Sequence, residues 1–425
     1  MTDAPVRALG EVAFENTRRF GKSDTDGIVY GVDKSVGLTS EPRYQSANLS
    51  RYKRLEQGMF AYNPMRLNIG SIGFCSSEHE AGIVSPDYIV FECDQDYLLP
   101  DFFYYHTKSR IWRKWLALAG QGSVRERIYF GNLAQYEFRV PNLLYQKAAV
   151  HILSGLDDTL ALIRRSNATL EAIAQAVFRD WFIDFGPVHR KLAGATDPTR
   201  VLGGLIQDYS QASRIAALFP SALGADGLPV GWSLGEFGDL AQTVGNTVEP
   251  ANLPAKMPYI GLEHMPRRSM VLDQWGSASE VHSAKTSFKK NDILFGKLRP
   301  YFHKVGIAAV DGVSSTDIVV LNANLVHDHA LIACCAASAA FVSFTNQDSD
   351  GTKMPRTGWA RMKRYPLAIA DVSVRKNFQA VVGPCLRKMV ASVTENHALA
   401  QTRDYLLPHL MSGRVSIFDA ERRAS

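Results

Sequence analysis

Two short loops carry a hydroxyl side chain and an arginine at the same spacing. Ser123 precedes Arg127 by four residues, Thr352 precedes Arg356 by four, and each hydroxyl residue directly follows a glycine. A glycine allows close backbone approach, a hydroxyl can donate to phosphate or to a base edge, and an arginine can pair bidentately with guanine. The two loops are therefore candidate contacts with duplex nucleic acid.

Further cationic and polar side chains gather in turn-rich segments of each half. Most surface Lys and Arg are simply solvated, so the prediction concerns the region more than any single residue. The net charge of +5 permits nucleic-acid binding without requiring it. The predicted DNA-contacting residues are Lys53, Arg54, Tyr62, Asn63, Arg66, Ser123, Arg125, Arg127, Lys297, Arg299, Thr352, Lys353, Arg356 and Arg361.

The sequence lacks the motifs of common nucleotide- and DNA-processing enzymes. It has no G-x-x-x-x-G-K-[ST] phosphate loop, no glycine-rich S-adenosylmethionine loop, and no Asp-x-Lys or Glu-x-Lys of a metal-dependent nuclease. Residues 63–66 read Asn-Pro-Met-Arg and lack the aromatic ring with which amino-methyltransferases stack on a flipped base. The His-Asp-His run at 327–329 has no further Cys/His cluster nearby. We therefore predict no catalytic residue, no metal ligand and no cofactor site.

Residues 143–178 show an apolar side chain at every third or fourth position. This heptad spacing pairs helices along a narrow stripe. The only glycine in the stretch is Gly155, so a continuous helix of about 54 Å is expected. Asn167 is a polar position in the seam, and such an Asn fixes register or partner at some cost in stability.

The same seam returns 229 residues later, with Asn396 in the place of Asn167. Ser392 and Arg403 interrupt this second stripe, so it is weaker. Two related helices in one chain can pack on each other, which favours an intramolecular pair over an ordinary amphipathic core helix. The predicted coiled-coil and subunit contacts are Leu156, Leu160, Ile163, Asn167, Leu170, Trp181, Phe182, Met389, Asn396, Leu399 and Leu406.

The repeat extends into the segments that precede the two helices. Short matches keep their order at a nearly constant offset, for example residues 85–90 with 315–320 and residues 122–136 with 351–365. Each segment holds short alternating or β-rich runs broken by Gly, Pro and Asn. The period is too long for a solenoid. We therefore predict two tandem copies of one α/β (α+β) unit, each followed by a long helix.

The composition is that of an ordinary soluble globular protein, with 46% hydrophobic and 21% charged residues among 425. Two or three domains are expected at this length. Five cysteines without a C-x-x-C pair favour a reducing compartment. The N-terminus lacks a signal-like sequence, and the longest apolar run, residues 330–342, is too short to span a bilayer. A cytoplasmic protein is expected.

Four segments carry a family resemblance. Residues 167–178 read Asn-Ala-Thr-Leu-Glu-Ala-Ile-Ala-Gln-Ala-Val-Phe, and residues 180–188 read Asp-Trp-Phe-Ile-Asp-Phe-Gly-Pro-Val. Pro-Val-Gly-Trp stands at 229–232 and Leu-Leu-Pro-His-Leu-Met-Ser-Gly at 406–413. Together they resemble the signatures of the specificity subunits of type I restriction-modification enzymes. The resemblance covers the whole chain in architecture, while its motifs are confined to the helices and the half-boundaries.

This resemblance implies a non-catalytic subunit whose two halves are target-recognition domains, each reading one part of a bipartite DNA site. The long helices would form an antiparallel coiled coil that sets the gap between the parts, although sequence symmetry alone leaves parallel pairing open. A short helix is expected near residues 210–218 of the linker. The expected divisions are recognition domain 1 (1–142), central helix (143–185), linker (186–226), recognition domain 2 (227–371), C-terminal helix (372–412) and tail (413–425).

The partners implied by the resemblance are double-stranded DNA, two modification (methyltransferase) subunits docked on the helices, and restriction (translocase and nuclease) subunits, with no membrane. S-adenosylmethionine, ATP and Mg²⁺ would be bound by those subunits. Two other functions stay open. A self-sufficient DNA methyltransferase or nuclease with an unrecognised motif would act on DNA alone. A coiled-coil scaffold would bind protein with little dependence on DNA or salt.

Overall fold

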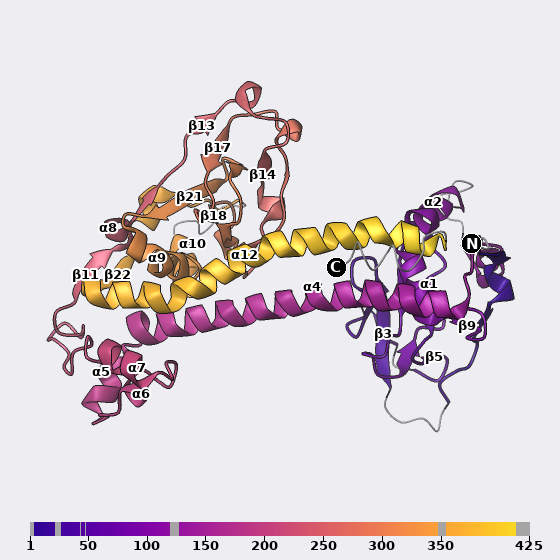
Figure 1. Ribbon diagram of the computed structural model, residues 1–425, viewed down its shortest axis with the longest axis horizontal. Coiled ribbons are helices and arrows are strands. Elements are labelled where there is room, and N and C mark those ends of the chain that lie inside the picture. The colour runs from indigo at the N-terminus through magenta and orange to yellow at the C-terminus, as the bar shows by residue number, and fades with distance from the viewer. Residues whose placement is uncertain are drawn as a thin grey trace. The chain divides into compact units, whose positions relative to one another are not determined.

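The computed structural model describes residues 4–21, 27–42, 44–46, 48–119, 127–346 and 354–413. The chain folds into two compact units, the first made of residues 1–160 with 399–425 and the second of residues 161–398. Two long helices, α4 (Leu143–Phe178) and α12 (Val372–Met411), each contribute a segment to both units (Figure 1).

Two four-stranded sheets form the framework of the first unit. Their strand orders are β2-β9-β6-β7 and β4-β3-β8-β5, and β1 pairs separately with β10. β3 runs parallel to β8, whereas the other pairs are antiparallel. The strands are Val6–Ala8 (β1), Ala13–Glu15 (β2), Ile28–Asp33 (β3), Gly37–Thr39 (β4), Lys53–Leu55 (β5), Phe60–Tyr62 (β6), Ile72–Phe74 (β7), Gly82–Val84 (β8), Ile89–Cys93 (β9) and Glu137–Arg139 (β10).

The sheet that contains β6 separates two cores because side chains alternate along a strand. Phe60 and Tyr62 face a core rich in aromatic residues, whereas Ala61 faces a smaller core shared with the other sheet. The rings of Phe60 and Phe91 stack with centroids 5.0 Å apart in the larger core. The short helices Pro100–Thr107 (α1), Arg110–Ala119 (α2) and Phe130–Leu133 (α3) contribute to that core, together with α4 and α12.

Two five-stranded sheets form the framework of the second unit. Their orders are β12-β21-β18-β19-β15 and β13-β17-β20-β14-β16, with β11 paired to β22. The strands are Ser233–Glu236 (β11), Ala241–Thr243 (β12), Thr247–Val248 (β13), Pro258–Ile260 (β14), Val271–Leu272 (β15), Gly276–Ser277 (β16), Lys285–Phe288 (β17), Ile293–Gly296 (β18), Val305–Ala308 (β19), Gly312–Ser314 (β20), Ile318–Ala323 (β21) and Pro366–Ile369 (β22).

The internal connectivity of these sheets matches that of the first unit. The order β2-β9-β6-β7 corresponds to β12-β21-β18-β19, and β5-β8-β3-β4 corresponds to β17-β20-β14-β16. The single parallel pair β3/β8 also has its equivalent in β14/β20. Side chains alternate in the same way, since Ile293 and Phe295 face one core and Leu294 the other. The second unit adds β13 and β15 at sheet edges.

Short helices cover the larger core of the second unit. They are Phe237–Leu240 (α8), His329–Ala336 (α9), Ala339–Asn346 (α10) and Trp359–Met362 (α11). In the part of the chain that the structure describes, no single helix has the length and apolarity to cross a membrane. By length and composition alone, the segment Val326–Ala336 and α10 could do so as a pair bent by 67°.

In the first unit, segments of α4 and α12 lie side by side (Figure 1). The hydroxyl of Tyr145 donates to the carbonyl oxygen of Leu410 at 3.2 Å. Farther along α4, the Arg403 guanidinium donates to the carboxylate of Asp157 at 2.9 Å. Higher residue numbers on α4 therefore meet lower numbers on α12, and the two segments run in opposite directions.

The second unit shows the same direction of pairing in its own helix segments. The amide of Asn167 donates to the hydroxyl oxygen of Ser392 at 2.8 Å, and that hydroxyl donates back to the Asn167 carbonyl oxygen at 3.0 Å. Nearer the C-terminal end of α4, the rings of Phe178 and Phe378 meet edge to face with centroids 6.5 Å apart. The buried amide is thus satisfied across the helix pair.

The segment expected to be a linker is folded in the second unit. It forms three helices, Gly186–Leu192 (α5), Pro198–Val201 (α6) and Tyr209–Ala216 (α7), and α7 lies where one short helix is expected. Their apolar faces join the core around Trp181. Both terminal guanidinium nitrogens of Arg190 donate to the Asp180 carboxylate, at 2.9 and 2.6 Å, and fix α5 against the π-helical turn that follows α4.

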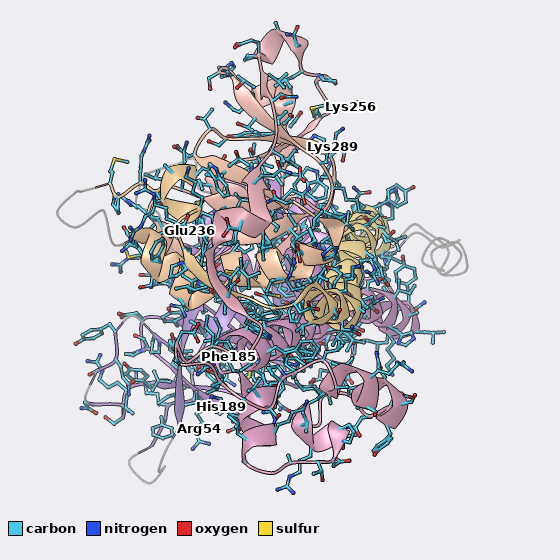
Figure 2. All side chains as sticks on the ribbon, turned by 90° about the vertical axis from the view of Figure 1, so that its left-hand side faces the viewer. Arg54, Phe185, His189, Glu236, Lys256 and Lys289 are labelled. Atoms are coloured by element: carbon cyan, nitrogen blue, oxygen red, sulfur yellow. The ribbon has the colours of Figure 1, made fainter. Side chains whose placement is uncertain are left out.

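The turn into α5 explains why this segment folds back. Phe185, labelled in Figure 2, has a left-handed backbone with a φ of 48°. Its ring meets Trp232 edge to face with centroids 5.6 Å apart. The contact offsets the strain of a non-glycine residue in this region, because it buries apolar surface at the reversal.

Candidate nucleic-acid interface

In the first unit, the hairpin turn after β6 meets the segment that carries Arg127. The backbone N–H of Ile128 donates to the carbonyl oxygen of Pro64 at 3.1 Å. The carbonyl oxygen of the Asn63 side chain accepts from the Met65 N–H at 2.9 Å and so shapes the turn. Arg66 at the end of the turn is exposed. Three predicted contacts, at positions 63, 66 and 127, therefore belong to neighbouring segments.

The second unit brings the equivalent segments together through more backbone bonds. Leu298 forms a bridge with Arg356, and the N–H of Arg299 donates to the Pro355 carbonyl oxygen at 2.8 Å. The N–H of Thr357 donates to the Lys297 carbonyl oxygen at 3.0 Å. Predicted contacts at 297, 299 and 356 thus share one edge of this unit. Segments far apart in the chain converge on it because β18 and β19 form a hairpin there.

An aspartate missed by the sequence analysis lies at each of these places. Asp87 follows β8 and Asp317 follows β20, each two residues after a serine. The serine hydroxyl oxygen accepts from the aspartate N–H, at 3.4 Å from Ser85 and 3.2 Å from Ser315. The aligned Ser-x-Asp turns were a signal in the sequence.

The aspartates bring negative charge to the predicted arginines. The Asp317 carboxylate lies 3.4 Å from the guanidinium of Arg356. In the first unit, the hydrogen bond from the Arg127 guanidinium to the Tyr129 hydroxyl, at 3.2 Å, is the main cause that raises the pKa of Arg127, and the charge of Asp87 contributes least. Arg356 therefore pairs with the aspartate of the strand turn, whereas Arg127 bonds a tyrosine hydroxyl.

Lys53 lies on β5 near the same cluster in the first unit. Its ammonium is 3.8 Å from the Glu15 carboxylate. Burial lowers the pKa of Lys53, and the carboxylates of Glu15 and Asp87 oppose that shift. Arg54, labelled in Figure 2, follows on the same strand and pairs through its backbone N–H with the carbonyl oxygen of Arg18 at 2.9 Å. Both predicted cations therefore belong to the sheet edge beside Asp87.

Other predicted contacts have structural surroundings. Tyr62 is 0% exposed in the aromatic core, so its side chain has no surface to offer DNA in this structure. The guanidinium of Arg361 lies 3.8 Å from the Phe344 ring and donates to the carbonyl oxygen of that residue. Arg299 has a left-handed backbone with a φ of 50° and is half-buried. Ser123, Arg125, Thr352 and Lys353 lie outside the described residues.

A hollow of about 510 Å³ opens beside the hairpin turn of the first unit. Its lining includes four tyrosines, Tyr30, Tyr44, Tyr52 and Tyr88, together with Asn63 and Arg66. Aromatic faces stack on bases, and amide and guanidinium groups hydrogen-bond base edges. Two residues predicted to contact DNA thus lie in a concave surface with suitable chemistry.

The predicted helix contacts are mostly removed from solvent. Leu156, Leu160, Trp181, Phe182, Met389 and Leu406 are buried, and Ile163, Leu170 and Leu399 are half-buried. Asn167 bonds Ser392, whereas the buried carbonyl oxygen of the Asn396 side chain has no partner among the described residues. Trp181 and Phe182 pack inside the core of the second unit. Their burial there leaves little of either ring for another subunit.

The described residues contain no group of three or more His, Cys, Asp or Glu side chains able to hold a metal ion. In the run at 327–329, the carboxylate of Asp328 pairs with Arg375. The ring of His329 is 2.7 Å from the carbonyl oxygen of Asn291. These contacts give the run a structural role.

The family model for the type I restriction modification DNA specificity domain matches residues 57–172. The HindI specificity subunit of Haemophilus influenzae is 22% identical over 98% of this chain and 100% of its own length. The MjaIX specificity subunit of Methanocaldococcus jannaschii is 19% identical over 76% of this chain and 71% of its own.

The solved structures give a match in fold. The crystal structure of the type I restriction-modification S subunit from M. genitalium has a TM-score of 0.56 at 13% sequence identity, and the match covers 96% of each chain. At that identity the likeness concerns the fold. The chain is thus similar in sequence to specificity subunits of type I restriction enzymes, and in fold to a type I restriction-modification S subunit.

Proposed function

We propose that this chain is the non-catalytic DNA specificity subunit of a type I restriction-modification complex. The observation that carries the proposal is the repeated fold, in which two units with matching strand order each present a hairpin turn, an arginine segment and a Ser-Asp turn together. Two copies of one DNA-contacting surface suit a bipartite DNA site with two recognised sequences, each of which we call a word. The family match of residues 57–172 supports the same function.

Each half, residues 1–142 and 227–371, acts as a target-recognition domain that reads one word. Residues 143–185 and 372–412 supply one antiparallel coiled coil, whose length sets the gap between the words and on which two modification subunits dock. Residues 186–226 fold as part of the second unit. Opposite helix direction within each unit supports this arrangement.

The chain itself carries out no chemistry on DNA. Modification subunits bind S-adenosylmethionine and methylate adenine, while restriction subunits use ATP and Mg²⁺. The complex works in the cytoplasm, and no membrane is involved. These assignments fit the absence of nucleotide, methyltransferase and nuclease motifs from the sequence.

Co-expression of this chain with the modification subunit from the same source, followed by genome-wide mapping of methylated adenine, tests the proposal. A bipartite motif with a fixed gap is expected, and it should vanish when this chain is omitted. Methylation or cleavage by the purified chain alone would instead establish a self-sufficient enzyme. Salt-insensitive binding to a protein, with no methylation from the complex, would establish a scaffold.

The helices give a second test. A heptad inserted after Leu160 and a matched heptad after Ala398 lengthen both helices where they pass from one unit to the other. The insertions add about 10 Å, so the gap in the methylated motif should grow by about three base pairs. A heptad inserted into α4 alone is the control, because it shifts the register of α4 against α12 without lengthening α12. An unchanged gap with the matched pair would contradict a helix that sets the spacing.

A further inference from the structure

The Ser-Asp turn is built alike in both units, although nothing in the strand framework requires an acid at its third position. The N–H of Tyr88 donates to the Ser85 carbonyl oxygen at 3.0 Å, and the N–H of Ile318 donates to that of Ser315 at 2.9 Å. These backbone bonds, with the serine hydroxyls, close each turn. The aspartate carboxylates take no part in closing the turns; Asp87 is exposed and Asp317 half-buried.

Around Asp317, the backbone fixes the carboxylate and the arginine segment relative to each other. The carbonyl oxygen of Asp317 accepts from the Lys297 N–H at 2.9 Å, and the Lys297 carbonyl oxygen accepts from the Thr357 N–H at 3.0 Å. Arg356 adjoins that last residue in the chain. The separation of 3.4 Å between its guanidinium and the carboxylate therefore rests on two backbone hydrogen bonds.

The ion pair itself contributes little to folding. The side chain of Arg356 is 60% exposed and that of Asp317 28% exposed, and ion pairs in such positions are screened by water. A carboxylate at a DNA-binding surface also repels phosphate. An aspartate at the same place in both halves therefore requires a role other than stability or general DNA affinity.

We propose that Asp317 is a specificity-determining residue that restrains Arg356 and opposes DNA without the correct base, and that Asp87, at the equivalent turn of the first half, opposes incorrect DNA there in the same way. The inference rests on the proposed function. On a cognate word, Arg356 exchanges one contact with the carboxylate for a bidentate contact with guanine. On any other word, it stays with Asp317, whose charge then disfavours the complex.

The test uses the complex of this chain with its modification subunit and duplexes in which one word of the wild-type motif is scrambled. Asp317→Asn should strengthen binding to a duplex in which the word read by the second half is scrambled. The ratio of the affinities for the cognate and the scrambled duplex should fall by about fivefold or more. Asp87→Asn should produce the same loss at the other word. Each variant should leave discrimination at the opposite word unchanged.

Asp311→Asn is the matched control, because it removes the same charge from an exposed ion pair in the same half. The carboxylate of Asp311 lies 3.1 Å from the ammonium of Lys289, away from the arginine segment. Asp311→Asn should change binding to cognate and scrambled duplexes by the same factor. Lys289 is labelled on the second half in Figure 2.

Two results would overturn the inference. Asp317→Asn could behave like Asp311→Asn, which would reduce the role of Asp317 to general charge. It could also weaken cognate binding with discrimination intact, which would leave Asp317 a structural role alone. If Asp317→Asn fails to fold, the result with Asp87→Asn decides. If the wild-type complex prefers neither word, the proposed function itself fails, and the two failures are thereby distinguished.

Discussion

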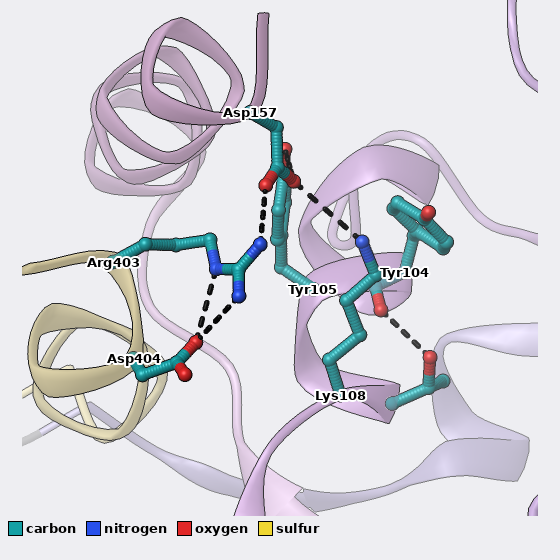
Figure 3. A network of polar contacts seen from close by, with 7 residues as sticks. Tyr104, Tyr105, Lys108, Asp157, Arg403 and Asp404 are labelled. Carbon is teal, nitrogen blue, oxygen red and sulfur yellow. Dashed lines mark hydrogen bonds and ion pairs between the residues drawn. The ribbon is translucent and has the colours of Figure 1, made fainter. Parts of the chain in front are cut away.

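In each unit, an acidic side chain of α4 contacts the globular half: Asp157 in the first unit and Glu171 in the second. Asp157 receives a hydrogen bond from the Tyr105 hydroxyl at 3.1 Å and lies 3.6 Å from the Lys108 ammonium (Figure 3). Glu171 instead accepts from a backbone group, the N–H of Met270, at 3.0 Å. The contact in the first unit is an ionic network of side chains. In the second unit, a side chain accepts a hydrogen bond from the backbone.

The helix pair repeats this contrast. In the first unit, the Asp157 carboxylate also receives the Arg403 guanidinium of α12, which contacts Asp404 as well (Figure 3). In the second unit, the neutral amide of Asn167 exchanges two hydrogen bonds with Ser392. A half-exposed ionic network tolerates small shifts, whereas a buried amide pair demands one register. We infer that helix register is determined mainly in the second unit.

The largest expected effect comes from opening the core that only the second unit builds with α5–α7. Trp181→Ala should lower the free energy of unfolding of that unit by about 3–5 kcal/mol, because a fully buried indole leaves a cavity. Trp112→Ala is the matched change in the first unit, where that indole is also buried. Hydrogen exchange resolved by residue should show each loss mainly in its own unit. Equal loss of protection in both units for both variants would contradict separate units.

Removing the amide pair should have the next largest effect. Asn167→Ala removes two buried hydrogen bonds, although the Ser392 hydroxyl keeps the Met389 carbonyl oxygen as an acceptor at 2.7 Å, and should cost about 1–3 kcal/mol in urea denaturation. Asn377→Ala is the control on α12, because that amide bonds the carbonyl oxygen of Ser373 within its own helix. Equal changes in the free energy of unfolding for the two variants would refute a register role for Asn167.

The ionic network should matter less and should depend on salt. Asp157→Ala removes a partner of Arg403, but Asp404 still pairs with that guanidinium at 2.8 Å. The expected loss is about 1 kcal/mol or less, and it should shrink in high salt. Denaturation of wild type and variant at low and high salt measures it. A larger, salt-independent loss would assign the first unit a rigid contact like that of the second.

The smallest effect concerns pH. Burial raises the pKa of Glu171 above its ordinary value of 4.5, although its hydrogen bonds from Met270 and Ser269 oppose the shift. Since the folded state holds this proton more tightly, the group costs stability as pH rises from 4.5 through the raised pKa. Glu171→Gln should make stability less dependent on pH there. A variant with the wild-type pH profile would exclude a contribution from Glu171.

The two long helices and the repeat could be predicted from the sequence, because the spacing of apolar residues is visible along the chain itself. The heptad seam predicted residues 143–178, and α4 spans Leu143–Phe178. The partner of Asn167 was not predictable in the same way. Pairing in opposite directions places it against Ser392, whereas the repeat suggests Asn396 only as its equivalent in sequence.

The candidate site was only partly readable. Cations mark it in the sequence, but the contact between Asp317 and Arg356 depends on three segments that meet through sheet hydrogen bonds. Composition also led to a wrong prediction for the segment that forms α5–α7. Gly, Pro and Ala there suggested a linker, whereas burial against Trp181 folds them. Tertiary contacts decide both cases.

The central claim is that each half reads its own word. Mapping methylated adenine for complexes with Arg127→Ala and with Arg356→Ala tests it most directly. The account predicts that each variant relaxes one word of the bipartite motif, that the two variants relax different words, and that the gap stays fixed. If both variants relax the same word, or weaken methylation at both words equally, the claim is contradicted.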